Sequence, residues 1–228
     1  MGDPLGSRET RAATVLDRLA ETYPDATISL SYSNRFELLV AVICSAQCTD
    51  ERVNAVTADL FETYSTPVEF AAVDQGELAE RLNSITYYNS KARYIRESAG
   101  LIVDDHDGRV PDTMADLTDL PGVGRKTANV VLQHGHDVVE GIVVDTHVKR
   151  LSRRLGLTEE TSPERIETDL MDIVPSERWQ EYTHLLISHG RATCTARNPD
   201  CADCVLEDAC PSSKLGSEVD LASGEPWK

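Results

Sequence analysis

The sequence has no apolar run that approaches the roughly 18 residues of a membrane span, and it opens with no apolar signal segment. We therefore expect a cytoplasmic protein whose cysteines are reduced rather than joined as disulfides. The alternation of apolar and polar residues that marks half-buried strands is almost absent, and no internal repeat is found. These absences argue against a membrane protein and against a fold built on β-strands.

Lysine is also scarce. It occurs only at positions 91, 126, 149, 214 and 228, so most of the positive charge comes from arginine. The 39 acidic residues outnumber the 22 basic ones, and the formal net charge is -17. A uniformly acidic surface repels nucleic acid. Either the partner is not nucleic acid, or the acidity is an adaptation to a salt-rich cytoplasm and a local basic face does the binding.

The segment 121–154 favours the second explanation. It holds six basic residues and three acidic ones, so its net charge is +3 in a chain of net charge -17. We expect these basic residues to lie mostly on one nucleic-acid-binding side, with the acidic residues of the chain on the far faces. The six are Arg125, Lys126, Lys149, Arg150, Arg153 and Arg154.

Four of the six cysteines fall within seventeen residues, spaced Cys194-x6-Cys201-x2-Cys204-x5-Cys210. Thiolates at this density indicate one metal centre, because zinc and iron–sulfur clusters both need four ligands that converge on one point. A structural zinc site usually has two Cys-x2-Cys-like pairs, and here only Cys201 and Cys204 are so spaced. The spacing therefore favours a [4Fe-4S] cluster, with zinc as the open alternative.

The spacing of apolar residues predicts helices almost throughout the chain. Asn34 followed by Glu37 resembles a capping box at the start of an apolar helix that runs to about Cys48. On that helix Cys44 and Cys48 share a face and are interpreted as small core residues. The run Ile142-Val143-Val144 is expected to be a buried linker. The expected helices cover 8–23, 35–48, a segment from Asp50, 78–82, 91–103, 146–155, 163–173 and 177–189.

The segment Leu120-Pro121-Gly122-Val123-Gly124-Arg125-Lys126-Thr127 joins two helical patterns. Pro121 ends the first helix, and the two glycines permit a tight turn and the close approach of another backbone. The next helix is expected to begin near Arg125, and its free N–H groups form an anion site. The pattern indicates a helix–hairpin–helix that grips a nucleic-acid phosphate. An ordinary helix–helix corner is the alternative.

Two residues of this region are candidates for chemistry. Lys126 lies in the first turn of the second helix, where it is either a nucleophilic amine or a lysine that only contacts phosphate. Asp145 follows an apolar run and opens a basic helix, so on local grounds it is an N-cap. A cap aspartate is held rigidly, so this role is compatible with that of a charge partner for an amine.

Several motifs in the same order resemble endonuclease III, an iron–sulfur DNA glycosylase with lyase activity. The resemblance spans about residues 8–211. The motifs are SAQCTD (45–50), YNSKA (88–92), LPGVGRKTANVV (120–131), VVDTHVKR (143–150) and HGRATCTARNPDCADCVLEDAC (189–210).

The resemblance implies an all-α fold of two helical domains. Residues 28–139 would form a six-helix barrel that contains the helix–hairpin–helix. Residues 1–27 and 140–211 would form a domain around a [4Fe-4S] cluster, and residues 212–228 a flexible tail. DNA is expected to lie across a cleft between the two domains. The cluster ligands of the family are matched by Cys194, Cys201, Cys204 and Cys210.

The implied function is that of a bifunctional DNA glycosylase/AP lyase of base excision repair. Its partner would be double-stranded DNA with damaged pyrimidines or abasic sites, and we expect a monomer associated with the nucleoid. Lys126 matches the family's Schiff-base nucleophile, and Asp145 matches its essential aspartate. The damaged, oxidised pyrimidine is flipped out, Lys126 attacks C1′ of the sugar, and β-elimination breaks the strand.

The resemblance also suggests DNA contacts, with two departures. Gln47 matches a residue that fills the vacated space in the duplex. Tyr87 stands where the family commonly has an aliphatic wedge. Arg197 is the only basic residue of the 195–200 loop, where the family usually has several. His147 is also expected to contact DNA, although the residues alone favour a packing or hydrogen-bonding histidine. Phosphate contacts are expected at Gly122, Gly124 and Arg125.

Other functions stay open. Adenine-specific mismatch glycosylases of this fold usually lack the catalytic lysine, and thymine-mismatch glycosylases commonly hold tyrosine there, so Lys126 argues against both. From a different class, the chain could be a non-catalytic DNA-binding module with a structural metal. Covalent trapping with borohydride on abasic DNA separates an enzyme from such a module.

Overall fold

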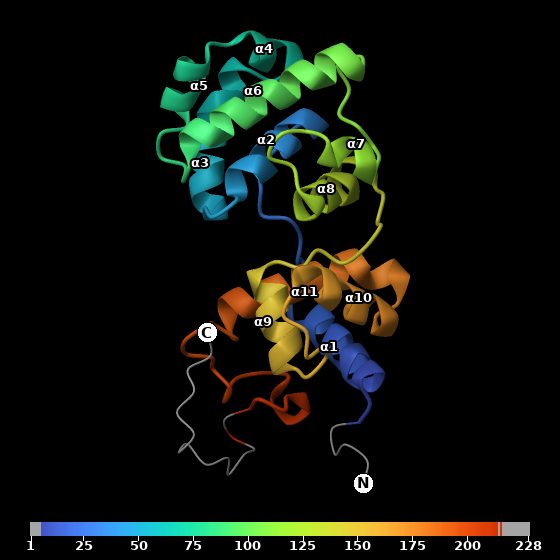
Figure 1. Cartoon of the computed structure of the whole chain (residues 1–228). Coiled ribbons are helices and arrows are strands. Elements are labelled where there is room, and N and C mark those ends of the chain that lie inside the picture. The colour runs from blue at the N-terminus through green and yellow to red at the C-terminus, as the bar shows by residue number, and fades with distance from the viewer. Residues whose placement is uncertain (1–5, 214, 216–228) are drawn as a thin grey trace. The chain divides into compact units, whose positions relative to one another are not determined.

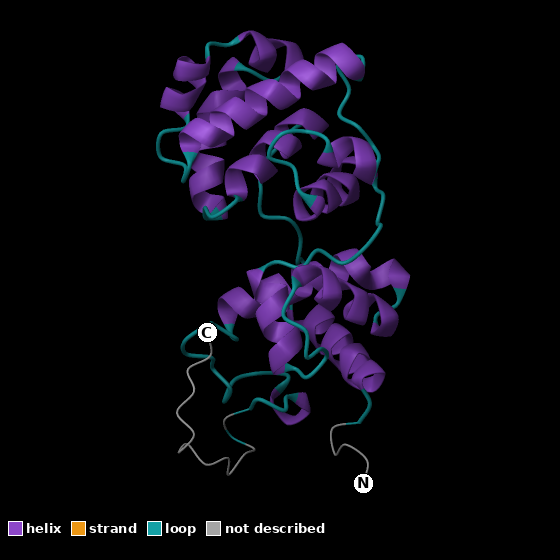
Figure 2. Cartoon of the chain, viewed as in Figure 1, coloured by secondary structure: helices purple, strands orange, loops and turns teal. Residues whose placement is uncertain are grey.

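The protein is described by a computed structural model that covers residues 6–213 and 215. These residues form helices joined by turns and loops, with no β-strand among them (Figure 2). The expected all-α fold class is confirmed. The chain divides into two compact units (Figure 1). We call Ile28–Val143 the central unit, and Met1–Thr27 together with Val144–Lys228 the terminal unit.

The central unit is built around helix α2. All of α2 from Phe36 to Cys44 is buried, and it contacts α3, α6 and α8. A helix that is apolar on nearly all sides belongs in a core rather than on a surface. The helices of this unit are α2 (Arg35–Ser45), α3 (Asp50–Thr63), α4 (Pro67–Ala72), α5 (Gln75–Arg81), α6 (Tyr88–Asp105), α7 (Met114–Thr118), α8 (Arg125–Val131) and the π-helical turn η1 (Leu132–His136).

The start of α2 is fixed by short polar side chains, as the sequence predicts. The Asn34 side chain accepts hydrogen bonds from the N–H groups of Phe36 and Glu37, at 3.0 and 2.9 Å. Glu37 reaches back: its Oε2 accepts from the backbone N–H of Ser33 at 2.6 Å, and its Oε1 accepts from the side-chain amide of Asn34 at 2.9 Å. The pair is therefore a variant of the capping box, and it satisfies N–H groups that the first helical turn leaves free.

The end of α2 differs from the expectation. The helix ends at Ser45, and residues 46–49 form a turn before α3, so Cys44 and Cys48 do not share a helix. Gln47 in this turn has φ = +55°, a left-handed conformation that no helix continues through. Cys44 is buried and Cys48 packs against the core from the side, so their interpretation as core residues holds for a different geometric reason.

The terminal unit packs helix α1 against α10 and α11, and α9 against α10 and α11. Helix α1 buries one apolar face, which includes Val15, Leu16 and Leu19. Its elements are α1 (Arg8–Thr22), α9 (Thr146–Arg154), α10 (Pro163–Ile173), the 3-10 turn η2 (Ser176–Arg178), α11 (Trp179–Ala192) and the 3-10 turn η3 (Glu207–Ala209).

The run Ile142–Val144 is non-helical and buried, as expected of a linker, and the boundary between the two units falls within it. Of the expected loose tail, residues 214 and 216–228 lie outside the described part. Ser213 is buried and its hydroxyl donates to Glu207 Oε1 at 2.9 Å, so the ordered structure extends beyond Cys210. No helix among the described residues is long and apolar enough to span a membrane.

Candidate active site and metal centre

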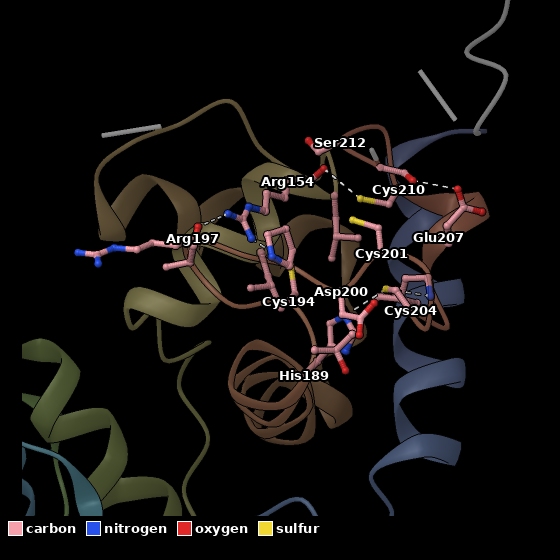
Figure 3. Close-up of a pocket in the computed structure, with 17 residues that line it drawn as sticks. Arg154, His189, Cys194, Arg197, Asp200, Cys201, Cys204, Glu207, Cys210 and Ser212 are labelled. Carbon is pink, nitrogen blue, oxygen red and sulfur yellow. Dashed lines mark hydrogen bonds between the residues drawn. The ribbon is translucent and has the colours of Figure 1, made fainter. Parts of the chain in front are cut away.

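The four clustered cysteines line one cavity of about 170 Å³ in the terminal unit (Figure 3). Cys194 directly follows the C-cap of α11, and Cys210 directly follows η3. Cys201 and Cys204 lie in the loop between these two elements. The sequence therefore identifies a set of residues that the fold does bring together.

The loop that carries the cysteines is a series of tight turns. The Asp200 N–H donates to Thr193 O at 3.0 Å, which closes the wide first gap between cysteines. Further along, the Glu207 N–H donates to Cys204 O at 3.1 Å and the Cys210 N–H donates to Glu207 O at 3.2 Å. These short backbone bonds turn the chain back on itself, so that thiols distant in sequence face the same cavity.

The cavity fits an iron–sulfur cluster better than a single ion. Among residues 6–213 and 215, no three His, Cys, Asp or Glu side chains lie close enough together to hold one metal ion. A zinc site would need four sulfurs about 2.3 Å from one point. Four thiols spread around a cavity suit a larger group held by four cysteines, which is how a [4Fe-4S] cluster is bound.

The surroundings of the thiols suit sulfurs that carry negative charge. An Arg154 guanidinium N–H lies 3.3 Å from Cys194 Sγ, and the Leu206 N–H lies 3.4 Å from Cys204 Sγ. Burial acts in the opposite direction, because it favours the neutral thiol: it raises the pKa of the Cys204 thiol and raises the pKa of Cys210 to about 11. Because metals bind thiolates, these thiols would release protons when the centre is loaded.

A buried histidine, His189 of α11, lies on the same cavity. Its Nε2 is 3.5 Å from Cys204 Sγ, and its Nδ1 is 3.2 Å from the hydroxyl of Tyr23 on α1. Burial lowers the pKa of His189 to about 4, so the ring is neutral near pH 7. His189 thus connects the cavity to the first helix of the chain without adding a positive charge.

Two arginines of α9 point into the terminal unit rather than outward. Arg154 donates to Thr195 O and Ala196 O, both at 2.8 Å. Arg150 donates to Gly190 O at 3.0 Å and to Cys194 O at 3.1 Å. The donors of these two arginines therefore hold the cysteine loop, which is a role that the sequence did not predict for them.

His147 is half-buried where α9 approaches α11. The His147 Nδ1 lies 3.1 Å from an Arg150 nitrogen. A Cβ added to Gly190 would lie 2.7 Å from this Nδ1. Burial holds the pKa of His147 below its ordinary value. The packing and hydrogen-bonding role favoured by the residues is confirmed, and Gly190 is what permits the close approach.

Asp145 is the N-cap of α9, as its local sequence predicts. Its Oδ1 accepts from the N–H groups of His147 and Val148, each at 2.8 Å. The residue is half-buried, and its other oxygen makes no hydrogen bond among the described residues. One oxygen thus fixes the carboxylate while the second stays available.

Lys126 is exposed in the first turn of α8, within the central unit. The helix starts at Arg125 as predicted, and its N-cap Gly124 offers no side chain to the free N–H groups. Gly122 has φ = +79°, and a Cβ there would lie 2.8 Å from the ring of Tyr94 on α6. The close neighbour is therefore a side chain rather than a backbone.

The two glycines of this turn have different roles. Gly124 is extended, and a Cβ added to it would have no neighbour within 4 Å. Only Gly122 is demanded by the fold, because its left-handed φ and its contact with Tyr94 both exclude a side chain. Packing among the described residues does not require a glycine at position 124.

The remaining expected DNA contacts are exposed. Gln47 lies in the turn after α2, and Tyr87 is the N-cap of α6 with φ = +58° and 64% exposure. Arg197 is exposed in the loop after Cys194. Gln47 and Tyr87 belong to the central unit with Lys126, whereas Arg197 belongs to the terminal unit with Asp145.

One residue of the YNSKA motif has a position that the sequence does not reveal. Lys91 is buried in the central unit, and its amine donates to two backbone carbonyls at the end of α2. The available signal is a lysine near the start of a helix, where the helix dipole disfavours a cation. Arg150 and Arg154 carried no such signal, because a basic helix near the cysteines looks the same whether it faces inward or outward.

Residues 40–176 match the family described as HhH-GPD superfamily base excision DNA repair protein, and residues 194–210 match the iron–sulfur binding domain of endonuclease III. Endonuclease III of Synechocystis sp. is 48% identical over 92% of this chain and 96% of its own length. Endonuclease III of Bacillus subtilis is 45% identical over 86% of this chain and 89% of its own length.

A solved structure described as a trapped endonuclease III–DNA covalent intermediate, an estranged-adenine complex, superposes with a TM-score of 0.87. It is 43% identical in sequence and covers 91% of this chain and 97% of that chain. The similarity therefore extends over both units of the chain and includes the segment that carries the four cysteines.

Proposed function

The chain belongs to the endonuclease III family, and from this premise we propose that it is a bifunctional DNA glycosylase/AP lyase that removes oxidised pyrimidines and nicks the strand. The observation that carries the proposal is the exposed amine of Lys126, held at the start of a helix that follows a Pro-Gly-x-Gly turn. An exposed amine on a rigid element can reach a sugar carbon, whereas a buried one cannot.

In the proposed reaction the damaged nucleotide leaves the stack, because its C1′ cannot be reached inside a duplex. The neutral amine of Lys126 attacks C1′, and the C1′–N bond breaks as the base leaves. The sugar ring then opens by cleavage of the C1′–O4′ bond, which leaves an imine between C1′ and Lys126, and this imine acidifies the 2′ proton. Removal of that proton breaks the bond to the 3′ oxygen by β-elimination, and water then releases the lysine.

Asp145 is proposed to assist the first step. Its Oδ1 is held by two backbone N–H groups, so the carboxylate has little freedom to turn away. The second oxygen would either take the proton that Lys126 loses or stabilise positive charge that develops on the sugar. This division of one carboxylate into an anchored oxygen and an active oxygen supports both the capping and the catalytic role.

The DNA contacts are proposed for residues that stay exposed. The N–H groups after Gly122 and Gly124, together with Arg125 and Arg197, would hold phosphates. Gln47 would fill the space left by the flipped nucleotide, and Tyr87 would insert or stack against the opposite strand. His147 is proposed as a weaker contact, since its ring nitrogen Nδ1 already lies beside Arg150.

The cofactor is a [4Fe-4S] cluster, and we propose Cys194, Cys201, Cys204 and Cys210 as its ligands. The bound cluster would hold the cysteine loop, and with it Arg197, in place. We further propose that the chain acts as a monomer in the cytoplasm, associated with the nucleoid. Size-exclusion chromatography with light scattering and imaging of a fluorescent fusion test these two points.

The proposed chemistry is tested by trapping with borohydride, which reduces a lysine–sugar imine to a stable covalent complex. Wild-type protein is expected to be trapped on abasic duplex DNA, and Lys126→Gln is expected to lose both trapping and strand cleavage. DNA binding should largely remain, because backbone N–H groups supply the phosphate grip. Lys149→Gln removes a lysine elsewhere and serves as the matched control; full trapping of Lys126→Gln would refute the assignment.

A further inference from the structure

Lys91 is a buried lysine without an acidic partner among the described residues. Its side chain is 4% exposed, and its Nζ donates to Cys44 O at 2.8 Å and to Ala46 O at 2.6 Å. Burial holds the pKa of Lys91 below its ordinary value. A buried ammonium paired only with carbonyls is costly, so such a placement calls for a reason beyond general stability.

The two carbonyls identify what the lysine does locally. They lie at the C-terminal end of α2, where the last carbonyls of a helix have no partner within the helix. Helix α2 has no basic residue in its own last turn. Lys91 supplies this charge from α6, although a cation near the start of α6 is unfavourable for α6 itself. The position of Lys91 is thus unfavourable for the dipole of its own helix, but it provides a contact between α6 and α2.

The same lysine connects two exposed residues with left-handed backbones. Gln47 follows Ala46, one of the clamped carbonyls, and has φ = +55°. Tyr87 has φ = +58°, and its carbonyl accepts the Lys91 N–H at 3.1 Å. Left-handed backbones outside glycine persist only where the surroundings hold them. Lys91 contacts the turn before Gln47 through its side chain, and it contacts the carbonyl of Tyr87 through its backbone N–H.

We propose that Lys91 is a positioning residue that fixes Gln47 and Tyr87 relative to each other, so that both side chains enter a DNA duplex as one preformed probe. This rests on the proposed function, because it assigns Gln47 and Tyr87 to the lesion site. A preformed pair enters the duplex without the entropy loss of ordering two separate loops. Without the clamp, each side chain would still be present but would act independently.

The helix α6 offers a matched control. Arg93 is an exposed cation two residues further along the same helix and lies over the ring of Tyr94, 5.1 Å from its centroid. Arg93→Met removes one positive charge from α6 without touching the carbonyls of α2. Lys91→Met removes the same charge and also frees the end of α2. A difference between the two variants therefore reports the clamp rather than the charge.

The experiment is a double-mutant cycle that combines Lys91→Met with Gln47→Ala and with Tyr87→Ala. Base release is measured in single turnovers on a lesion duplex, and insertion is followed by fluorescence of 2-aminopurine placed opposite the lesion. Lys91→Met is expected to slow base release by on the order of ten-fold or more. In that background Gln47→Ala and Tyr87→Ala should each cost much less than in the wild type.

Borohydride trapping on a single-stranded abasic oligonucleotide separates this proposal from the proposed function. That substrate has no opposite strand, so Lys91→Met should be trapped like the wild type. Absence of trapping in the wild type would overturn the lyase assignment itself. Fold losses that simply multiply in the cycle, or equal losses on single-stranded and duplex substrates, would overturn the role of Lys91.

Folding is checked by circular dichroism and thermal unfolding. If Lys91→Met does not fold, Lys91→Gln is used, because its shorter, neutral side chain keeps N–H donors but removes the charge. The same coupling with Gln47→Ala and Tyr87→Ala is expected. If both Lys91 variants fail to fold while Arg93→Met folds, Lys91 serves stability alone and the proposal is overturned.

Discussion

The core of the central unit and the cysteine loop of the terminal unit are held by different means. In the central unit every residue from Phe36 to Cys44 is buried. In the segment 193–213 only Leu206 and Ser213 are buried. Ordering a backbone costs about 1–2 kcal/mol per residue, whereas apolar burial returns roughly 25 cal/mol per Å². We therefore expect the central unit to be ordered by its own side chains and the cysteine loop to depend on the bound cluster.

The largest expected effect follows from removing the cluster. Cys204→Ala, or protein freed of iron, should lose the visible colour of an iron–sulfur centre, and backbone amides of 193–213 should exchange rapidly with solvent. Residues 36–44 should stay protected, because nothing in α2 depends on the cofactor. Hydrogen exchange measured by mass spectrometry reports both regions in one sample.

Cys48→Ala is the control for this comparison, because Cys48 packs beside the core of the central unit and lies outside the cysteine loop. It should keep the colour and the protection of 193–213. If iron removal lowered the protection of 193–213 and of 36–44 from hydrogen exchange equally, the core of the central unit would also depend on the cluster, and the comparison would be wrong.

Asp145 tests whether the terminal unit contributes to the chemistry as well as holding the cluster. Asp145→Asn should keep the fold, because asparagine is also a good N-cap. The single-turnover rate of base release should fall by roughly 10²–10⁴, as expected when a positioned acid–base group is lost. Quenched-flow assays on a lesion duplex, with binding measured separately, give this rate.

Asp145→Ala separates the two roles of this carboxylate. It should lose about as much rate as Asp145→Asn and in addition lower the free energy of unfolding by about 1 kcal/mol, because alanine cannot cap α9. A near-normal rate in Asp145→Asn would leave Asp145 with the capping role alone.

Gly122 tests how strongly the central unit depends on its own packing. Gly122→Ala should lower the free energy of unfolding by about 1–3 kcal/mol, because alanine is strained at φ = +79° and its Cβ would meet the Tyr94 ring. Gly124→Ala, with open space around it, should change it by less than about 1 kcal/mol. Thermal unfolding of the two variants side by side checks the difference, and equal losses would contradict it.

The smallest expected effect concerns surface charge. Phosphate contacts weaken as salt rises, while repulsion between DNA and distant acidic residues is screened by the same salt. We therefore expect affinity for DNA to fall only gradually as salt rises. We also expect the protein to remain active at salt on the order of 1 M, where the Debye length is about 3 Å. Fluorescence anisotropy across a salt series, with parallel cleavage assays, measures both.

A charge-neutralised variant sharpens this measurement. Asp104 and Asp105 are exposed at the end of α6 opposite to Tyr87, roughly 25 Å along the helix at about 1.5 Å per residue. Asp104→Asn with Asp105→Asn should bind more tightly at low salt and lose affinity more steeply as salt rises. A steep loss in the unmodified chain, with no activity at molar salt, would refute the salt adaptation.

Much of the helical framework could be predicted from the sequence. The long helices α1, α3, α9 and α10 lie close to where apolar spacing places them. The short helices α4 and α7 and the π-helical turn η1 were not predicted, because five to six residues carry too little periodicity to be distinguished from loops. Helix α2 was predicted three residues too long, because the residues near Ser45 include no glycine or proline that would indicate the end of a helix.

Some features of the candidate site could also be predicted from the sequence, and others could not. The spacing of the cysteines predicts that they converge, and their position around one cavity agrees with it. The directions of Arg150 and Arg154 were not predictable, because charge composition does not say which face of a helix is covered. Capping by Asp145 was predictable because the cap and its two donors lie within three residues.

By itself the sequence determined where the side-chain-capped helices α2, α3 and α10 begin and which cysteines gather. Asn34, Thr49 and Ser162 each cap a helix through a side chain that reaches N–H groups two or three residues ahead. Such contacts depend on local geometry alone. Only the tertiary structure decided that the amine of Lys91 donates to the carbonyl of Cys44, 47 residues earlier in the chain. A contact of that separation forms only when helices pack, because no local rule brings its two ends together.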